Sequence, residues 1–325
     1  MNGINRRRFT AAVTAGIALG SKSTLAADFP SKPIKIIVPW PAGGGGDVVV
    51  RVLAPAISER LNTPVLVDNR PGATGTIGTR LAAQSPADGY TLVYGSADSN
   101  SIMPNLMKSV GYDARKGFTA VAPIGFFPFV LAVHPSVAAN NFKELVQIAK
   151  SSGEKMAFGS WGVGSSGQVF IESIKAAAGI DLLHVPYQGT GPLLTALIGG
   201  QVKGAMLPMQ LAEQHAKSGA IRLLGVATPG RIPTYPALPT LREQGVQIDL
   251  TAWVGFLAPA QVPADVVGSL HRAIEEASAS PAIAERLRQL HVVPQPISQR
   301  DYQTFVEAEY DRWGKVIQQA GITLE

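Results

Sequence analysis

Two glycine-rich turns, each between an apolar run and a predicted helix, carry the clearest chemistry in this sequence. The first spans residues 41–47 (PAGGGGD) and the second spans residues 159–167 (GSWGVGSSG). A strand, a tight turn and a helix start together direct unpaired backbone N–H groups and the positive end of a helix dipole toward one point, which favours an anion. Two such turns predict two lobes that face each other across a cleft and hold the ends of one negatively charged small molecule.

Other residue types form no recognisable catalytic or metal-binding pattern. The chain has no cysteine, which excludes a disulfide framework, a thiolate nucleophile and a zinc-thiolate site. Its five histidines lack metal-ligand spacing, and the sequence contains neither a G-x-S-x-G elbow nor an H-E-x-x-H pair. We therefore expect a protein that is not an enzyme and that uses neither a metal nor a cofactor.

One motif keeps an enzyme open as an alternative. Gly162, Gly164 and Gly167 match the dinucleotide pattern G-x-G-x-x-G between a predicted strand and a predicted helix, and Asp181 follows nineteen residues after Gly162. Asp181 does not follow a convincing second strand, where that fold places its ribose-binding acid. The alternative function is a secreted dinucleotide-dependent oxidoreductase, whose cofactor would absorb light in the purified protein.

Strands and helices alternate along the first part of the chain. Predicted strands cover residues 34–38, 65–67 and 90–94, and predicted helices cover residues 48–61 and a segment that ends near residue 84. This alternation predicts an α/β fold with a parallel sheet and helices on both faces. Ligands of such sheets bind beyond the carboxyl ends of the strands, where the loops after these strands lie.

A second α/β unit follows the proline-punctuated stretch 123–135. Its predicted helices cover residues 142–151, 168–178 and 192–198, and its predicted strands cover residues 156–158, 182–185, 202–207 and 222–227. After another apolar, proline-rich stretch at 252–263, helices are predicted at 265–278, 281–289 and 298–319, the last with Ser298 as its N-cap. Two such stretches indicate that the chain leaves the first lobe and returns to it. We predict a first lobe of residues 28–128 plus 254–325 and a second lobe of residues 129–253.

The first 27 residues are typical of an export signal. Arg6 and Arg7 precede a mildly apolar stretch at 11–20 and small residues before Asp28, so we expect cleavage near Ala27 and a periplasmic product. Loss of this segment's four basic residues reduces 28 Lys and Arg to 24, against 23 Asp and Glu, which leaves a net charge of +1. The remaining protein is nearly neutral, which gives no support to a nucleic-acid partner or an acidic membrane surface.

Several sequence blocks, taken together, resemble one family along almost the whole chain. The blocks are PWPAGG at 39–44 with Asp47 and Arg51, DNRPGA at 68–73, ADGYTL at 87–92, HVPYQG at 184–189, GGQV at 199–202 and PTLREQG at 239–245. They are similar to the Bug-type extracytoplasmic receptors of tripartite tricarboxylate transporters. The resemblance implies a two-lobed, type II periplasmic binding protein, each lobe a mostly parallel sheet flanked by helices. Such a protein is expected to be a monomer that closes on a small carboxylate, either a di- or tricarboxylate or an aromatic carboxylate, and presents it to membrane permease subunits.

The resemblance also implies how the ligand is held: by main-chain amides, hydroxyl groups and bridging waters, without an arginine clamp. We assign one end of the ligand to the first turn and the opposite end to the second turn. The predicted ligand-binding residues are Trp40, Ala42, Gly43, Gly44, Gly45, Thr74, Ser96, Asp98, Ser160, Trp161, Gly164, Ser165, Ser166, Tyr187 and Gly189. We expect Asp47 to be a structural cap and Phe126, Phe127 and Phe129 to pack within a lobe.

Two tryptophans bear on the choice of ligand. Family members commonly have Phe at the position of Trp40, and Trp161 lies inside the second turn. Either indole is structural, with no bearing on the ligand, or it lines the cleft and favours a flat acid over a flexible one. On the second interpretation we expect an aromatic or compact dicarboxylate to bind more tightly than citrate.

The export signal gives a first testable prediction. Because small residues precede Asp28, the exported protein is expected to begin at or next to Ala27 or Asp28. Intact-mass analysis of the periplasmic protein checks this expectation. An exported protein whose mass includes residues 1–27 would contradict it.

Overall fold

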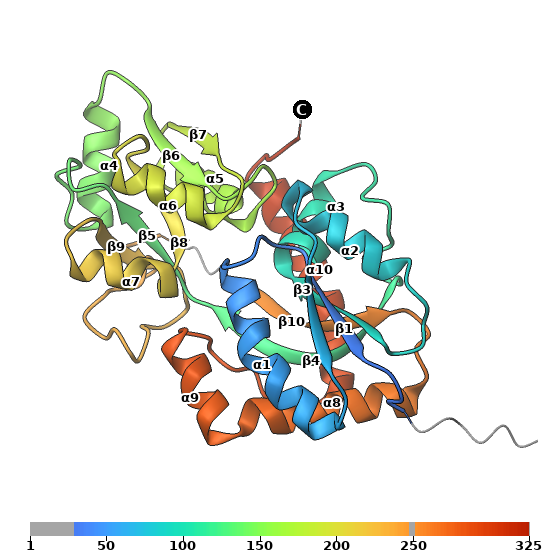
Figure 1. Cartoon of the computed structure of the whole chain (residues 1–325). Helices are drawn as coiled ribbons and strands as arrows, with labels where there is room; N and C mark the ends of the chain where they lie inside the picture. The colour runs from blue at the N-terminus through green and yellow to red at the C-terminus, as the bar shows by residue number, and fades with distance from the viewer. Residues whose placement is uncertain (1–28, 247–250, 325) are drawn as a thin grey trace, which may run out of the picture.

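The computed structural model describes residues 29–246 and 251–324, and their helices and strands form two lobes (Figure 1). Each lobe contains one five-stranded sheet flanked by helices. The predicted export signal lies outside the described residues.

The first lobe begins with strands and helices in strict alternation. Its elements up to the first crossing are β1 (Ile34–Val38), α1 (Gly45–Leu61), β2 (Val65–Asn69), η1 (Ala73–Gly75), α2 (Thr76–Ala83), β3 (Thr91–Ser96), the π-helical turn η2 (Asp98–Ile102), α3 (Met103–Leu106) and β4 (Phe118–Phe127). The chain returns to this lobe with β10 (Ala252–Pro259), α8 (Ala264–Ala279), α9 (Pro281–Gln289) and α10 (Gln299–Gln319).

The second lobe is one continuous stretch of chain. Its elements are β5 (Phe129–Val133), α4 (Phe142–Ser151), β6 (Met156–Ser160), α5 (Ser166–Ala178), β7 (Leu182–Pro186), α6 (Thr190–Ile198), β8 (Gly204–Pro208), α7 (Met209–Lys217) and β9 (Arg222–Val226). The predicted helices and strands of both lobes are confirmed to within a few residues. Ser298 is confirmed as the N-cap of α10, because its side chain accepts a hydrogen bond from the Asp301 amide.

The two sheets share one plan. The strand order is β2-β1-β3-β10-β4 in the first lobe and β7-β6-β8-β5-β9 in the second. β10 runs antiparallel to β3 and β4, β5 runs antiparallel to β8 and β9, and the remaining neighbours are parallel. Both sheets are therefore mixed. Within each sheet, all strands except the reversed one, β10 in the first and β5 in the second, run in the same direction. This arrangement confirms the predicted two-lobed α/β fold with mostly parallel sheets.

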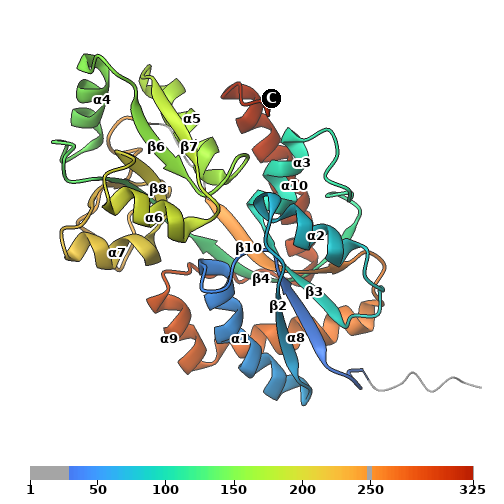
Figure 2. The same ribbon diagram turned by 45° about the horizontal axis from the view of Figure 1, so that its top comes forward.

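The reversed strand of each sheet is the one that arrives from the other lobe. At the first crossing, β4 ends at Phe127 and β5 begins at Phe129, so a single residue, Pro128, connects the two sheets (Figures 1 and 2). β10 follows the strands of the second sheet and inserts between β3 and β4. The predicted domain limit at 128/129 lies at the first crossing, and the limit at 253/254 lies inside β10, two residues after its start; both limits stay predictions.

Three strands at the crossings were not predicted, because prolines in β4 and β10 argue against strands. β4 contains Pro123, but it is an edge strand, where a missing N–H costs no ladder hydrogen bond. Its register with β10 also shifts beside Pro123. β10 avoids the problem because its proline, Pro259, is its last residue. The helix α7 was also not predicted.

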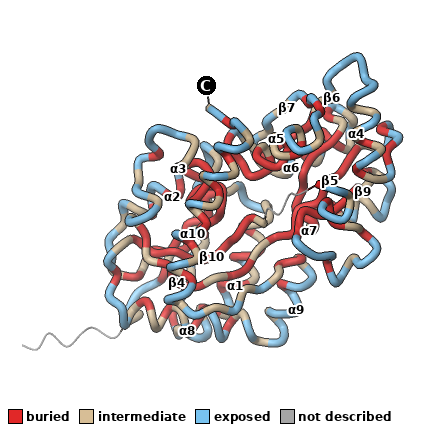
Figure 3. The backbone as a smooth tube through the Cα atoms, turned by 180° about the vertical axis from the view of Figure 1, so that it is seen from behind, coloured by how far each residue is buried: buried red, intermediate tan, exposed pale blue. Residues whose placement is uncertain are grey.

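The core consists of the two sheets and the inner faces of their helices (Figure 3). The apolar residues of β1, β3, β5, β8 and β10 are almost fully buried, as expected for strands covered on both faces. α10 belongs to the first lobe but extends to the second, where Trp313 packs edge-on against Phe170 of α5 with ring centroids 6.4 Å apart.

A close backbone contact holds the segment after α9 against β4, the outer strand of the first sheet. Gly125 in β4 has φ +142°, and a Cβ there would lie 2.1 Å from the carbonyl oxygen of Val293. The next residue, Phe126, exchanges two backbone hydrogen bonds of 3.0 Å with Val293. The segment after α9 is thus held directly on β4, and only glycine leaves room for it.

Gly125→Ala is therefore expected to destabilise the fold by about 2–4 kcal/mol, through backbone strain and overlap with a carbonyl group that cannot move freely. Gly153→Ala is the matched control, since a Cβ at that position meets no atom within 4 Å. Urea unfolding of both variants tests the difference. Equal midpoints for the two variants would show that the Val293 segment adjusts without cost.

Candidate functional site

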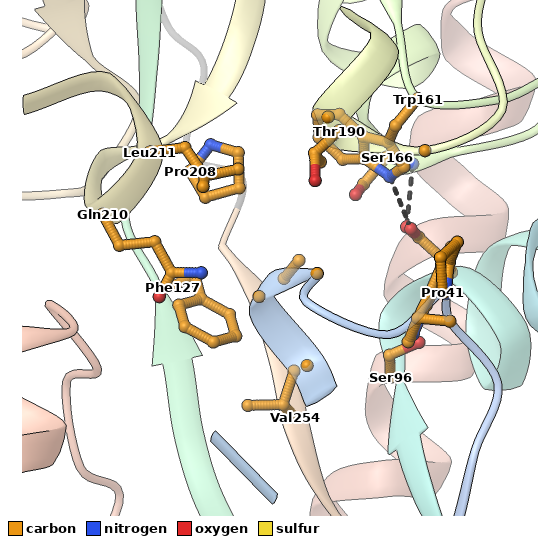
Figure 4. Close-up of a pocket in the computed structure, with 18 of the residues that line it drawn as sticks. Pro41, Ser96, Phe127, Trp161, Ser166, Thr190, Pro208, Gln210, Leu211 and Val254 are labelled. Atoms are coloured by element: carbon orange, nitrogen blue, oxygen red, sulfur yellow. Dashed lines mark hydrogen bonds between the residues drawn. The ribbon is translucent and has the colours of Figure 1, made fainter. Parts of the chain in front are cut away.

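A cavity of about 380 Å³ lies between the lobes (Figure 4). It is lined by the first glycine-rich turn, by the ends of β3 and β4, by the start of β10, and by the starts of α5, α6 and α7. Ten of the predicted ligand-binding residues line it: Trp40, Ala42, Gly43, Gly44, Gly45, Ser96, Asp98, Trp161, Ser166 and Gly189. The sequence therefore located the cavity, although contact with a ligand stays a prediction.

The first turn is shaped by Asp47. Its carboxylate accepts hydrogen bonds from the Gly43 amide at 2.8 Å, from Asn69 Nδ2 at 2.9 Å and from Arg51 Nε at 2.9 Å. Burial alone would raise the pKa of this carboxyl, but the hydrogen bonds from Arg51, Gly43 and Asn69 hold it below its ordinary value. Asp47 is not among the residues that line the cavity. It ties the turn to α1, as expected of a structural residue.

The start of α1 presents unpaired donors to the cavity. Gly44 is the N-cap, and its amide donates to the Pro41 carbonyl oxygen at 3.1 Å. Among the described residues, none accepts a hydrogen bond from the amides of Gly45 and Gly46, the first two residues of the helix. Both glycines line the cavity. Free amides at the positive end of a 17-residue helix form an anion-binding point.

The second turn already holds an anion that belongs to the protein. Asp98, at the start of η2 in the first lobe, accepts hydrogen bonds from the Ser166 amide at 2.8 Å and from Trp161 Nε1 at 2.9 Å (Figure 4, dashed lines). Ser166 is the first residue of α5, so the Asp98 carboxylate lies where the helix dipole favours negative charge. These two bonds also join the lobes directly.

Several other donors of the second turn have partners inside the protein, whereas the buried Ser166 hydroxyl has none among the described residues. The Gly164 amide donates to Gln168 Oε1 at 2.7 Å, and Ser165 caps α5 by accepting from the Gln168 amide. Ser160 Oγ lies 2.6 Å from His184 Nε2. Burial lowers the pKa of His184, which favours the neutral ring. Ser160, Gly164 and Ser165 are absent from the cavity lining, and their assignment to the ligand stays a prediction.

Thr74 and Tyr187 also lie outside the lining. Thr74 Oγ1 donates to the Val163 carbonyl oxygen at 2.7 Å and so forms another bond between the lobes. The Tyr187 amide donates to the Ser160 carbonyl oxygen at 2.9 Å, and the Gly189 amide donates to that of Trp161 at 3.2 Å. These contacts fix the loop after β7 against the second turn.

Both predicted tryptophans lie in the cavity wall, in different roles. Trp161 is only 6% exposed, stacks on Phe129 with ring centroids 5.1 Å apart and donates to Asp98. Trp161 therefore stabilises the contact between the lobes and also forms part of the cavity wall. Trp40 is half-buried, and among the described residues none accepts a hydrogen bond from its indole N–H.

Several wall residues were not predicted. Phe127 and Phe129 were expected to pack within a lobe, and they do so, but they also line the cavity because they flank the crossing at Pro128. Tyr94, Thr190, Gln210 and Trp253 line it as well. Gln210 follows the carboxyl end of β8, which is the position where the α/β plan places ligand contacts. That rule could have identified Gln210 as a wall residue from the sequence.

The cavity has little charge of its own. Of the described residues that line it, Asp98 alone carries a formal charge, and most of the others are aromatic, aliphatic or glycine. Burial raises the pKa of the Asp98 carboxyl above its ordinary value, against the hydrogen bonds from Ser166 and Trp161 that lower it. Burial, together with the Asp98 charge, also raises the pKa of Tyr94.

The dinucleotide alternative finds no support in this geometry. The G-x-G-x-x-G segment does join β6 to α5, but the Ser166 amide within it is bonded to Asp98. Asp181 precedes β7, at the end of the sheet opposite this loop, and pairs with Lys155 at 2.6 Å. Within residues 29–246 and 251–324, no group of acidic or histidine side chains is arranged to hold a metal ion. In the same residues, no helix is long and apolar enough to cross a membrane.

Comparison with known proteins agrees with this description. A family model described as "Tripartite tricarboxylate transporter family receptor" matches residues 49–322. Protein BugT of Bordetella pertussis is 32% identical over 315 residues, which cover 96% of this chain and 95% of BugT.

Solved structures extend the likeness to three dimensions. R. palustris Rpa4515 with adipate is 31% identical with a TM-score of 0.87, over 91% of this chain and 99% of that one. The periplasmic binding protein BugD is 30% identical with a TM-score of 0.84, over 91% of this chain and 100% of that one.

The buried Asp98 carboxylate predicts a pH effect on stability. The folded-state pKa lies above the ordinary value of 3.8, so the folded protein binds this proton more tightly than the unfolded chain does. As pH rises from about 4 through the raised pKa, the free energy of unfolding of the wild type should therefore fall relative to that of Asp98→Asn. Urea unfolding of both proteins from pH 4 to 8 measures this difference. A difference that stays constant with pH would mean that Asp98 titrates alike in both states.

Proposed function

Since the chain belongs to the tripartite tricarboxylate transporter receptor family, we propose that it is a periplasmic receptor that captures a small carboxylate and delivers it to the permease subunits of such a transporter. The family is one of solute-binding receptors, and this chain has the two-lobed fold of a periplasmic binding protein. The adipate bound in Rpa4515 supports a carboxylate ligand. We include export, cleavage near Ala27 and a monomeric state in the proposal.

The observation that carries the proposal is the pair of free amides at the start of α1. Gly45 and Gly46 face a cavity enclosed by both lobes and have no acceptor among the described residues. A carboxylate there would gain about 0.3–1 kcal/mol from the helix dipole, up to about 2 when partly buried. Charge-assisted hydrogen bonds would add about 1.5–3 kcal/mol each. With burial of the ligand body, these terms are sufficient for binding in the micromolar range, about −8 kcal/mol.

The rest of the cavity suits the uncharged part of such a ligand. Phe127, Phe129 and the indoles of Trp40 and Trp161 form broad apolar surfaces, and Thr190 and Gln210 supply neutral polar groups. A site of this composition fixes a ligand's orientation through a few polar contacts and gains affinity from apolar burial. In this proposal the protein binds its ligand without transforming it.

A thermal-shift screen tests the proposal directly. Aliphatic and aromatic mono-, di- and tricarboxylates are added to the purified protein, with the corresponding amides and alcohols as uncharged controls. A true ligand at 100 times its dissociation constant stabilises the folded state by about 2.7 kcal/mol. The proposal fails if no carboxylate stabilises the protein, or if the uncharged controls do so equally.

The role of the α1 amides gives a sharper prediction, with Gly45→Pro as the variant. Proline fits the first position of a helix, and Gly44 already has the extended backbone (φ −71°, ψ 164°) that a residue before proline requires. The substitution removes one amide donor and leaves α1 intact. Calorimetry with the best carboxylate of the screen should show at least tenfold weaker binding, about 1.4 kcal/mol.

Gly45→Ala is the control for this change. It retains the amide, and its Cβ approaches the flexible end of the Gln210 side chain much as a proline Cβ would. We expect Gly45→Ala to bind within about threefold of wild type, which is less than about 0.7 kcal/mol. Equal losses in the two variants would assign the effect to crowding at Gln210 and remove Gly45 from the anion site.

A further inference from the structure

The two ends of the cavity differ in the charge they can accept. At the α1 end, the Gly45 and Gly46 amides have no acceptor among the described residues. At the α5 end, the Ser166 amide and Trp161 Nε1 both donate to Asp98. These two donors are thus used by a carboxylate of the protein itself, whereas the buried Ser166 hydroxyl has no partner among the described residues.

Asp98 is built into this position. Its side chain is only 5% exposed, and its two oxygen atoms accept one hydrogen bond each, at 2.8 and 2.9 Å. Both partners are donors, which is the arrangement that an ionised carboxylate requires. Trp161 is in turn held by its stack on Phe129, and a Cβ on Gly167 would lie within 3 Å of its ring. Neither partner can turn away without disturbing the second lobe.

No cation compensates Asp98 within the cavity. Of the described lining residues it alone is charged, and the walls beside it are the rings of Trp161 and Phe129. A ligand that brought a second carboxylate to this end would lie near the Asp98 charge in an environment of low polarity, where like charges repel strongly. Displacing Asp98 instead would leave a buried carboxylate without its partners.

We propose that Asp98 is a specificity-determining residue that makes this receptor select monocarboxylates, with the carboxylate at the start of α1 and an apolar body toward Trp161 and Phe129. This inference rests on the proposed function and narrows its substrate class. Asp98 takes the place of a second ligand carboxylate at the α5 end. The selectivity separates this chain from Rpa4515, whose structure holds the dicarboxylate adipate.

The test uses ligand pairs of matched size in which a methyl group replaces the second carboxylate. The pairs are hexanoate with adipate and 4-methylbenzoate with terephthalate, titrated by calorimetry at neutral pH. The wild type is expected to bind the monocarboxylate of each pair at least tenfold more tightly. In Asp98→Asn, this ratio should fall at least tenfold, because the variant removes the charge and keeps the side-chain volume.

One further variant serves as a control. Asp181→Asn removes a negative charge outside the cavity, where the carboxylate pairs with Lys155 and is 58% exposed, so it should leave the ratio unchanged. A ratio that falls equally in Asp98→Asn and Asp181→Asn would assign the effect to net charge and overturn the inference.

Each remaining outcome is also decisive. Tighter or equal binding of adipate and terephthalate by the wild type overturns the inference and leaves the proposed receptor function intact. An unchanged ratio in a folded Asp98→Asn variant overturns it as well. The wild-type comparison is sufficient by itself if that variant does not fold. No binding of any of the four acids, together with no stabilisation in the carboxylate screen, contradicts the proposed function instead.

Discussion

The first amides of an α-helix have no acceptor within the helix, and this constraint organises the whole site. The chain places two helix starts, those of α1 and α5, on either side of one cavity. The two helix starts differ in their hydrogen-bond acceptors. At α5 the first amide donates to Asp98, whereas at α1 the Gly45 and Gly46 amides have no acceptor among the described residues. The site is therefore asymmetric. At α5 the first amide is already bonded to Asp98, whereas at α1 the first two amides are available to a ligand.

The bonds that complete one end also connect the lobes. Asp98 reaches Trp161 and Ser166, Thr74 reaches Val163, and elsewhere His291 Nε2 lies 2.7 Å from Glu213 on α7. A typical hydrogen bond contributes a net 0.5–1.5 kcal/mol, so several together offset part of the cost of bringing two lobes into contact. A ligand that binds at α1 then has to supply less of the free energy of closure.

Much of this architecture could be predicted from the sequence. Apolar periodicity located the strands and helices that alternate regularly, and the glycine-rich turns located the cavity between them. The strands at the crossings were not predicted, because Pro123 argues against a strand unless the strand is known to lie at a sheet edge. Edge position depends on β10, more than 120 residues away, and no local pattern reports it.

Most hydrogen-bond partners of the predicted site residues also could not be inferred from the sequence. The second turn was predicted to hold one end of the ligand, which stays a prediction, and in the structure it binds the Asp98 carboxylate. Asp98 and Ser166 are 68 residues apart, and their pairing depends on how the two lobes meet. Asp47 could be predicted, since its partner Gly43 is four residues away. In this chain, local contacts could be inferred from residue types, whereas contacts between the lobes required the structure.

The interleaved strand order has a consequence for how the chain acquires its structure. All five strands of the second sheet come from one continuous segment, from Phe129 to Val226. The first sheet lacks its fourth strand until β10 inserts between β3 and β4, and β10 begins only at Ala252. During synthesis the later lobe can therefore finish its sheet before the earlier one. Closing so long a loop is slow, since the entropy of chain closure is lost before the contacts form. The first lobe is thus the last to become native, and with it the free amides of α1 reach their positions.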